Sequence, residues 1–96
     1  MHFEDLWNKC ESISDKESST DDLVKNLEMK FAFLKALLLK KESIDESEYA
    51  SAVNKLFGEV LFSLTQLSFY ENINVFKSLN ESYNFQNINN LNDKYK

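Results

Sequence analysis

Carboxylates are the side chains of this 96-residue sequence with the greatest capacity for chemistry. The chain contains 16 Asp and Glu residues but a single histidine, His2, and a single cysteine, Cys10. One His and one Cys are too few for a zinc site, and no Ser or Cys stands beside His2 as an activated nucleophile would. With one glycine, Gly58, the chain has no glycine-rich phosphate loop. Oxygen-ligand chemistry with a hard cation such as Mg²⁺ remains.

One candidate cation site is a series of acids at three-residue spacing, formed by Glu42, Asp45 and Glu48. Acids also gather at the start of a helix because the helix dipole stabilises negative charge there. We interpret this series as the solvated first turn of a helix rather than as a cation site.

A second candidate is a set of carboxylates on facing helices, where Glu residues three positions apart share one helical face. Carboxylates on facing helices can share a divalent cation.

The elements that position these acids are predicted to be helices. The absence of proline and the single glycine favour an all-α chain. Apolar periodicity predicts helices over about 3–13, 20–41, 45–70 and 75–88, followed by an Asn-rich C-terminal tail. Ser19, Ser43 and Asn74 are expected to cap the last three helices. The length and the 43% hydrophobic content predict one domain, residues 1–96.

Two of the predicted helices carry apolar surfaces that are wider than one partner helix would cover. Their main stripes recur at helical spacing: Leu23, Leu27, Phe31, Leu34 and Leu38 on one helix, and Val53, Leu56, Val60, Leu64 and Leu67 on the other. We therefore expect an all-α four-helix bundle completed by dimerisation, as a homodimer or a higher homo-oligomer.

Composition also limits the partners. A net charge of −5 argues against a nucleic-acid surface. The densest apolar run, residues 31–39, is interrupted by Lys35 and is too short to span a bilayer, so no membrane partner is expected. The N-terminus lacks the pattern of a secretory signal, and a single cysteine fits a reducing compartment. A soluble, cytoplasmic protein is predicted.

The third predicted helix also carries a family resemblance. Gly58-Glu59-Val60-Leu61-Phe62-Ser63-Leu64 resembles the signature E-E-L-G-D-V-L-F-x-L of the MazG-like nucleoside triphosphate pyrophosphohydrolases. Further similarity is spread along the chain, in Leu6-Trp7-Asn8-Lys9 (family L-W-x-K), Lys35-Ala36-Leu37 (E-A-L) and Glu71-Asn72-Ile73-Asn74-Val75 (L-G-I-D-P). The resemblance implies an all-α fold in which E-E-x-x-E and E-x-x-D motifs on two helices hold Mg²⁺. In the family these ions bind the triphosphate and activate water, releasing pyrophosphate.

The metal-ligand positions of the family are mostly apolar here. Aligned on Ala36-Leu37, the two ligand positions of the first motif fall on Met29 and Ala32, and those of the second fall on Leu56 and Glu59. In this alignment Glu28 and Glu59 are the remnant acids, and no catalytic residue is named. Losing three anionic ligands removes most of the charge that would hold Mg²⁺. The simpler interpretation of the two acids is surface pairing on their own helices, Glu28 with Lys25 and Glu59 with Lys55. Such pairs are worth only about 0.2–0.5 kcal/mol each, so charge pairing alone does not explain the two acids.

Three hypotheses follow. The first is a catalytically degenerate MazG-like protein that acts as a binding or assembly module, with a nucleotide or a protein as partner. The second is an active Mg²⁺-dependent pyrophosphohydrolase whose ligands are Glu28, Glu59 and an acid from the 42–48 series or a second chain. The third is an unrelated helical protein–protein interaction module.

Overall fold

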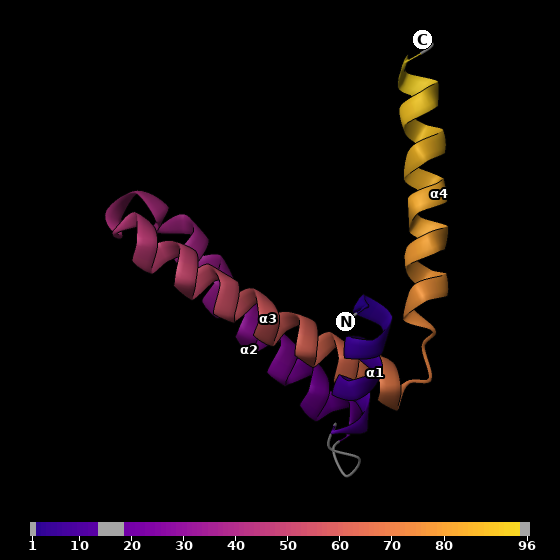
Figure 1. The fold of residues 1–96 in the computed structure, drawn as a ribbon, viewed down its shortest axis with the longest axis horizontal. Helices are drawn as coiled ribbons and strands as arrows, with labels where there is room; N and C mark the ends of the chain where they lie inside the picture. The colour runs from indigo at the N-terminus through magenta and orange to yellow at the C-terminus, as the bar shows by residue number, and fades with distance from the viewer. Residues whose placement is uncertain (1, 14–18, 95–96) are drawn as a thin grey trace.

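The computed structural model describes residues 2–13 and 19–94 of the chain, and its regular elements are all helices. The elements are α1 (Phe3–Ser12), α2 (Thr20–Leu39), a short 3₁₀ helix η1 (Lys41–Ser43), α3 (Glu46–Tyr70) and α4 (Val75–Lys94) (Figure 1). The described residues contain no strand. The prediction of an all-α fold is confirmed.

The architecture is a long antiparallel hairpin of α2 and α3, with α1 packed against α3 at one end (Figure 1). α4 leaves the end of α3 and extends away from the other three helices (Figure 1). Its described contact with α1 is an edge-to-face pair of rings, Phe3 and Phe76, with centroids 6.4 Å apart. Within one chain, then, three helices pack together and the fourth stands apart.

Two predicted caps are confirmed. The Ser19 hydroxyl accepts a hydrogen bond from the backbone N–H of Asp22 at 3.2 Å. The side-chain oxygen of Asn74 accepts one from the N–H of Lys77 at 3.0 Å. Each satisfies a backbone donor that the first turn of a helix leaves without a partner.

The predicted cap at Ser43 is wrong. α3 begins at Glu46, and its cap is Asp45, whose carboxylate accepts from the N–H of Glu48 at 3.4 Å. Ser43 belongs to η1 instead, and its hydroxyl donates to the carbonyl of Lys40 at 2.9 Å. Asp45 directly precedes the first helical turn and is the better cap. Its carboxylate accepts a backbone hydrogen bond, and its negative charge is stabilised by the helix dipole.

The turn between α3 and α4 depends on Asn72, which has a left-handed backbone with φ of 56°. This conformation lets the N–H of Ile73 donate back to the carbonyl of Ser68 at 2.8 Å, as in the helix-terminating Schellman motif. Asn is one of the few residues besides glycine that adopts a left-handed conformation readily.

Two helix ends differ from the prediction. α2 ends at Leu39 rather than at 41, because the chain tightens into η1. α4 continues to Lys94 rather than ending at 88 in an irregular Asn-rich tail. Asparagine costs at most about 0.7 kcal/mol in a helix, against about 3 for proline, and the segment contains neither proline nor glycine. Nothing in it is strong enough to stop the helix.

The core of the described chain is small. Its buried apolar side chains are Trp7, Leu23 and Leu34, and its buried polar side chains are Ser63, Thr65 and Ser68 on α3. The hydroxyls of Thr65 and Ser68 donate to carbonyls of their own helix, at 2.9 and 2.7 Å. Small, internally satisfied side chains allow a neighbouring helix to approach α3 closely.

The surface is correspondingly large. The accessible area is 7672 Å², whereas a folded monomer of 11.3 kDa is expected to expose about 5,700 Å². The radius of gyration is 16.5 Å, against about 12.5 Å for a compact chain of this length. One copy of the chain leaves much apolar surface in water.

Candidate functional site

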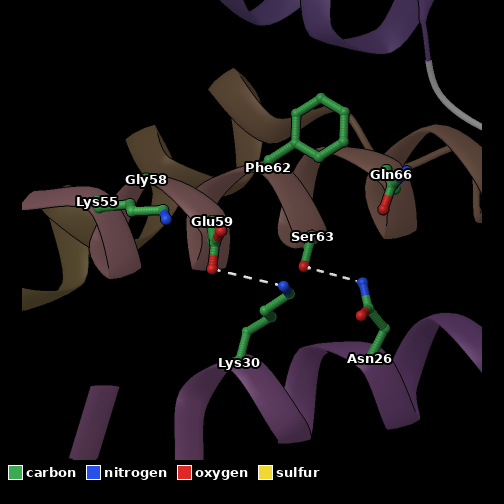
Figure 2. A pocket seen from close by; sticks show the side chains of 8 residues that line it. All are labelled: Asn26, Lys30, Lys55, Gly58, Glu59, Phe62, Ser63 and Gln66. Atoms are coloured by element: carbon green, nitrogen blue, oxygen red, sulfur yellow. Dashed lines mark hydrogen bonds and ion pairs between the residues drawn. The ribbon is translucent and has the colours of Figure 1, made fainter. Parts of the chain in front are cut away.

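A groove with charged and amide side chains lies between α2 and α3. It has a volume of about 490 Å³. Figure 2 shows its walls, with the α2 residues reaching across toward α3. The lining residues are Asn26, Lys30, Lys55, Gly58, Glu59, Phe62, Ser63 and Gln66. We call this surface the polar groove.

Two interactions cross the polar groove from α2 to α3 (Figure 2). Lys30 Nζ lies 3.4 Å from a carboxylate oxygen of Glu59, with 27% and 36% of the two side chains exposed. One helical turn away, the side-chain amide of Asn26 donates to the Ser63 hydroxyl at 3.2 Å. Because the helices run antiparallel, one turn forward on α2 corresponds to one turn back on α3, which aligns both pairs.

The structure separates the two remnant acids. Glu59 lines the polar groove, whereas Glu28 is exposed and does not line it. Of the three replaced ligand positions, Met29 is 47% exposed, Ala32 is exposed and Leu56 is half-buried in the hairpin. Glu59 pairs with Lys30 on the facing helix instead of with Lys55 on its own. The interpretation of Glu59 as a surface pair within one helix is therefore wrong.

No metal centre is formed by the part of the chain that the structure describes: no three or more His, Cys, Asp or Glu side chains lie close enough to hold an ion. In the acidic series before α3, Asp45 acts as the helix cap. Hydrogen bonds from the Ser47 hydroxyl and the backbone N–H of Glu48 lower the pKa of Asp45 below 3.8, its ordinary value. This confirms its interpretation as part of a helix start.

A second, apolar cavity lies beside the polar groove and is bounded by α1 and α3. It has a volume of about 200 Å³. Its lining residues are Phe3, Leu6, Trp7, Cys10, Gly58, Leu61, Phe62 and Thr65. Gly58 and Phe62 line both hollows, so the two are contiguous on α3. We call this surface the aromatic cavity.

Gly58 has open space above it. A Cβ built at this position would meet no other atom within 4 Å. An interior glycine costs about 1 kcal/mol relative to alanine, and packing within this chain gives no reason for it. Its closest surroundings are the two hollows.

The opposite side of the hairpin is apolar. Phe31 and Leu38 on α2 are 57% and 48% exposed, and Phe57 and Leu64 on α3 are 54% and 39% exposed. At 100° per residue, Phe31 and Leu38 lie roughly a quarter turn from Lys30 on α2, and Phe57 and Leu64 lie nearly opposite Glu59 on α3. We call this surface, made of Phe31, Leu38, Phe57 and Leu64, the apolar side.

Sequence reasoning missed Asn26, Lys30 and Ser63 as site residues. Lys30 does leave a signal, because it interrupts the leucine series Leu23, Leu27, Leu34 and Leu37 at a position that shares their face. A charged residue inside an apolar stripe indicates a partner on the facing helix. Ser63 leaves none, since a serine reads equally well as an exposed residue.

The chain matches no protein-family model, no curated protein and no solved structure. Among the helices described, none is both long enough and apolar enough to cross a lipid bilayer.

Proposed function

We propose that this chain is a MazG-like helical protein that has lost pyrophosphohydrolase activity and acts as a homodimeric binding and assembly module. The observation that carries the proposal is the partner of Glu59. This acid occupies the one family ligand position that keeps an oxygen, and it lies 3.4 Å from the ammonium of Lys30. An ammonium thus balances the charge that a divalent cation would balance in an active member of the family.

The other family ligand positions support the same conclusion. Met29, Ala32 and Leu56 offer no oxygen to a cation. Mg²⁺ prefers six oxygen ligands at short distance and is held by carboxylates together with water and phosphates. A cation in the polar groove would find one carboxylate and two lysines, Lys30 and Lys55. That balance of charge repels Mg²⁺.

The apolar side supports assembly. The whole chain, including α4, exposes roughly 1,900 Å² more surface than a compact monomer of its mass, and a stable interface of standard size needs about 800 Å² per partner. A second copy presents the same aromatic and aliphatic surface, as a twofold interface requires. Two α2–α3 hairpins joined in this way would make a four-helix core.

The charges beside the apolar side fit a second copy. Glu28 and Lys35 are seven residues apart on α2, so they lie on the same edge of the helix. Along the helix, one precedes Phe31 and the other follows it. A twofold axis that crosses α2 near Phe31 would bring Glu28 of each copy to Lys35 of the other. Such pairs select orientation in helical interfaces. This arrangement gives Glu28 a role that a metal site does not supply.

Pyrophosphate release tests the loss of activity. The folded protein is incubated with a panel of ribo- and deoxynucleoside triphosphates and Mg²⁺ or Mn²⁺, beside the Glu59→Gln variant. The proposal predicts no release above a protein-free control from either protein. Release by the native chain that disappears in Glu59→Gln would contradict it and establish a working metal site.

A further inference from the structure

We infer that the polar groove and the aromatic cavity together form a metal-independent binding site for a small phosphomonoester with a flat apolar body. The inference goes beyond the proposed loss of activity and assembly, and depends on neither. It stands on the contiguity of the two hollows at Gly58 and Phe62.

The polar groove has the composition of an anion site. Lys30 and Lys55 supply two positive charges against the single negative charge of Glu59. Lys55 lies one turn before Glu59 on α3 and makes no ion pair among the described residues. Asn26 on α2 and Gln66 on α3 add a side-chain amide to each wall of the groove. Phosphate oxygens accept hydrogen bonds from such groups strongly, since both partners of a lysine–phosphate contact are charged.

The aromatic cavity has the composition of a pocket for a ring. Phe3, Trp7 and Phe62 contribute aromatic surface, and the rings of Phe3 and Trp7 lie 5.7 Å apart. Its volume of about 200 Å³ exceeds the roughly 150 Å³ of an apolar cavity that takes up benzene. Flat apolar groups gain from offset or edge contacts with such rings.

Gly58 connects the two parts. It lines both the groove and the cavity, and no other atom lies within 4 Å of the place where its side chain would begin. A ligand with a ring in the cavity and a phosphate in the groove would cross α3 at this residue. This accounts for a glycine in the middle of a long helix, where the chain's own packing does not.

The test uses phenyl phosphate in the presence of EDTA, with binding followed by the fluorescence of Trp7, the single tryptophan of the chain. Inorganic phosphate and phenol are tested separately, as the phosphate group and the aromatic ring of this ligand. The expected result is saturable binding of phenyl phosphate, at least tenfold tighter than that of either part. Equal affinity for phenol and phenyl phosphate, or no saturable change with phenyl phosphate, would overturn the inference.

Variants distinguish this site from a metal site and from nonspecific charge. Lys30→Met and Lys55→Met should each weaken phenyl phosphate binding about tenfold, and Lys25→Met, on the same helix as Lys30 but outside the groove, should not. Gly58→Leu places a bulky side chain between the groove and the cavity and should weaken binding by a similar factor. Glu59→Gln removes the competing anion and should tighten binding severalfold, whereas a metal site would lose affinity. Far-UV circular dichroism confirms that each variant is folded, and unchanged binding in both lysine variants would overturn the inference.

The phosphate group could also belong to a lipid. Vesicles of phosphatidylcholine with phosphatidic acid present that head group on a membrane, and no binding is expected, because two acyl chains do not fit the aromatic cavity. Binding to these vesicles without binding to soluble phenyl phosphate would overturn the inference in favour of a lipid surface.

Discussion

The two sides of the α2–α3 hairpin differ in how well contacts within one chain satisfy their side chains. On the groove side, Lys30 meets Glu59 and Asn26 meets Ser63, so polar groups of one helix satisfy those of the other. The apolar side exposes Phe31 and Phe57, one from each helix and each by more than half, whereas the groove side exposes Phe33 of α2 beside its polar pairs. A surface with satisfied polar pairs is stable in water, whereas exposed aromatic surface is stabilised by being covered. In our proposals, the groove side binds a ligand and the apolar side binds a second copy.

The largest expected effect comes from placing a charge on the apolar side. Phe31→Glu should weaken the dimer by about 4 kcal/mol, or roughly a thousandfold, because a twofold interface contains each substitution twice and a buried aromatic anchor is worth about 2 kcal/mol. Phe33→Glu is the matched control, since Phe33 lies two residues away on the groove side and is 53% exposed. Size-exclusion chromatography with light scattering measures both masses. Equal loss of the dimer in the two variants would remove the distinction between the sides.

Gly58→Ala tests whether the groove side is open. With no atom within 4 Å of the added Cβ, the substitution should raise the free energy of unfolding by about 1 kcal/mol through helix propensity alone. Chemical denaturation measures the change. A destabilised variant would mean that another backbone approaches Gly58 in solution, and the second copy would then belong on this side.

Charge reversal at the edge of the apolar side tests the position of the twofold axis. Glu28→Lys and Lys35→Glu should each weaken the dimer by about 0.5–1 kcal/mol, because each places like charges opposite one another in both halves of the interface. The double variant restores opposite charges and should recover most of the loss. If the losses of dimer affinity in the two single variants simply add in the double variant, Glu28 of one copy does not meet Lys35 of the other.

Asp45 provides the smallest effect, at the end of the hairpin and away from both sides. Its pKa is lowered in the folded chain, so the stabilisation it supplies is present above 3.8 and is lost as the pH falls through the folded-state pKa. Asp45→Asn keeps a capping side chain but removes this titration. Thermal unfolding between pH 2 and 7 should show a weaker acid dependence for the variant and nearly equal midpoints near pH 7. An unchanged acid dependence would show that Asp45 does not contribute.

The sequence predicts the helices of this fold better than their packing. Helix type and most boundaries follow from periodicity and from local capping groups such as Ser19 and Asn74, which act within one turn. The position of α4 does not follow, because it depends on a single left-handed residue, Asn72. Ser63, Thr65 and Ser68 look like surface residues in sequence, yet they are buried because α3 needs small side chains where its neighbours approach.

For the site, too, the sequence predicts local features better than contacts between helices. The sequence identifies Glu59 as a retained acid and Gly58 as an unexplained glycine, and both lie in the groove. It does not identify the partner of Glu59, since pairing across the hairpin depends on the register of α2 against α3. Glu28 looks equivalent to Glu59 in sequence but lies outside the groove, because it is two residues from Lys30 and therefore on another face of α2.

Sedimentation equilibrium of the unaltered chain tests the central claim most directly. The account predicts a mass near twice 11.3 kDa that persists at micromolar concentration, because the apolar side is covered by a second copy. A mass of one chain across the whole concentration range would contradict it. The apolar side would then have to be covered by something other than a second copy of this chain.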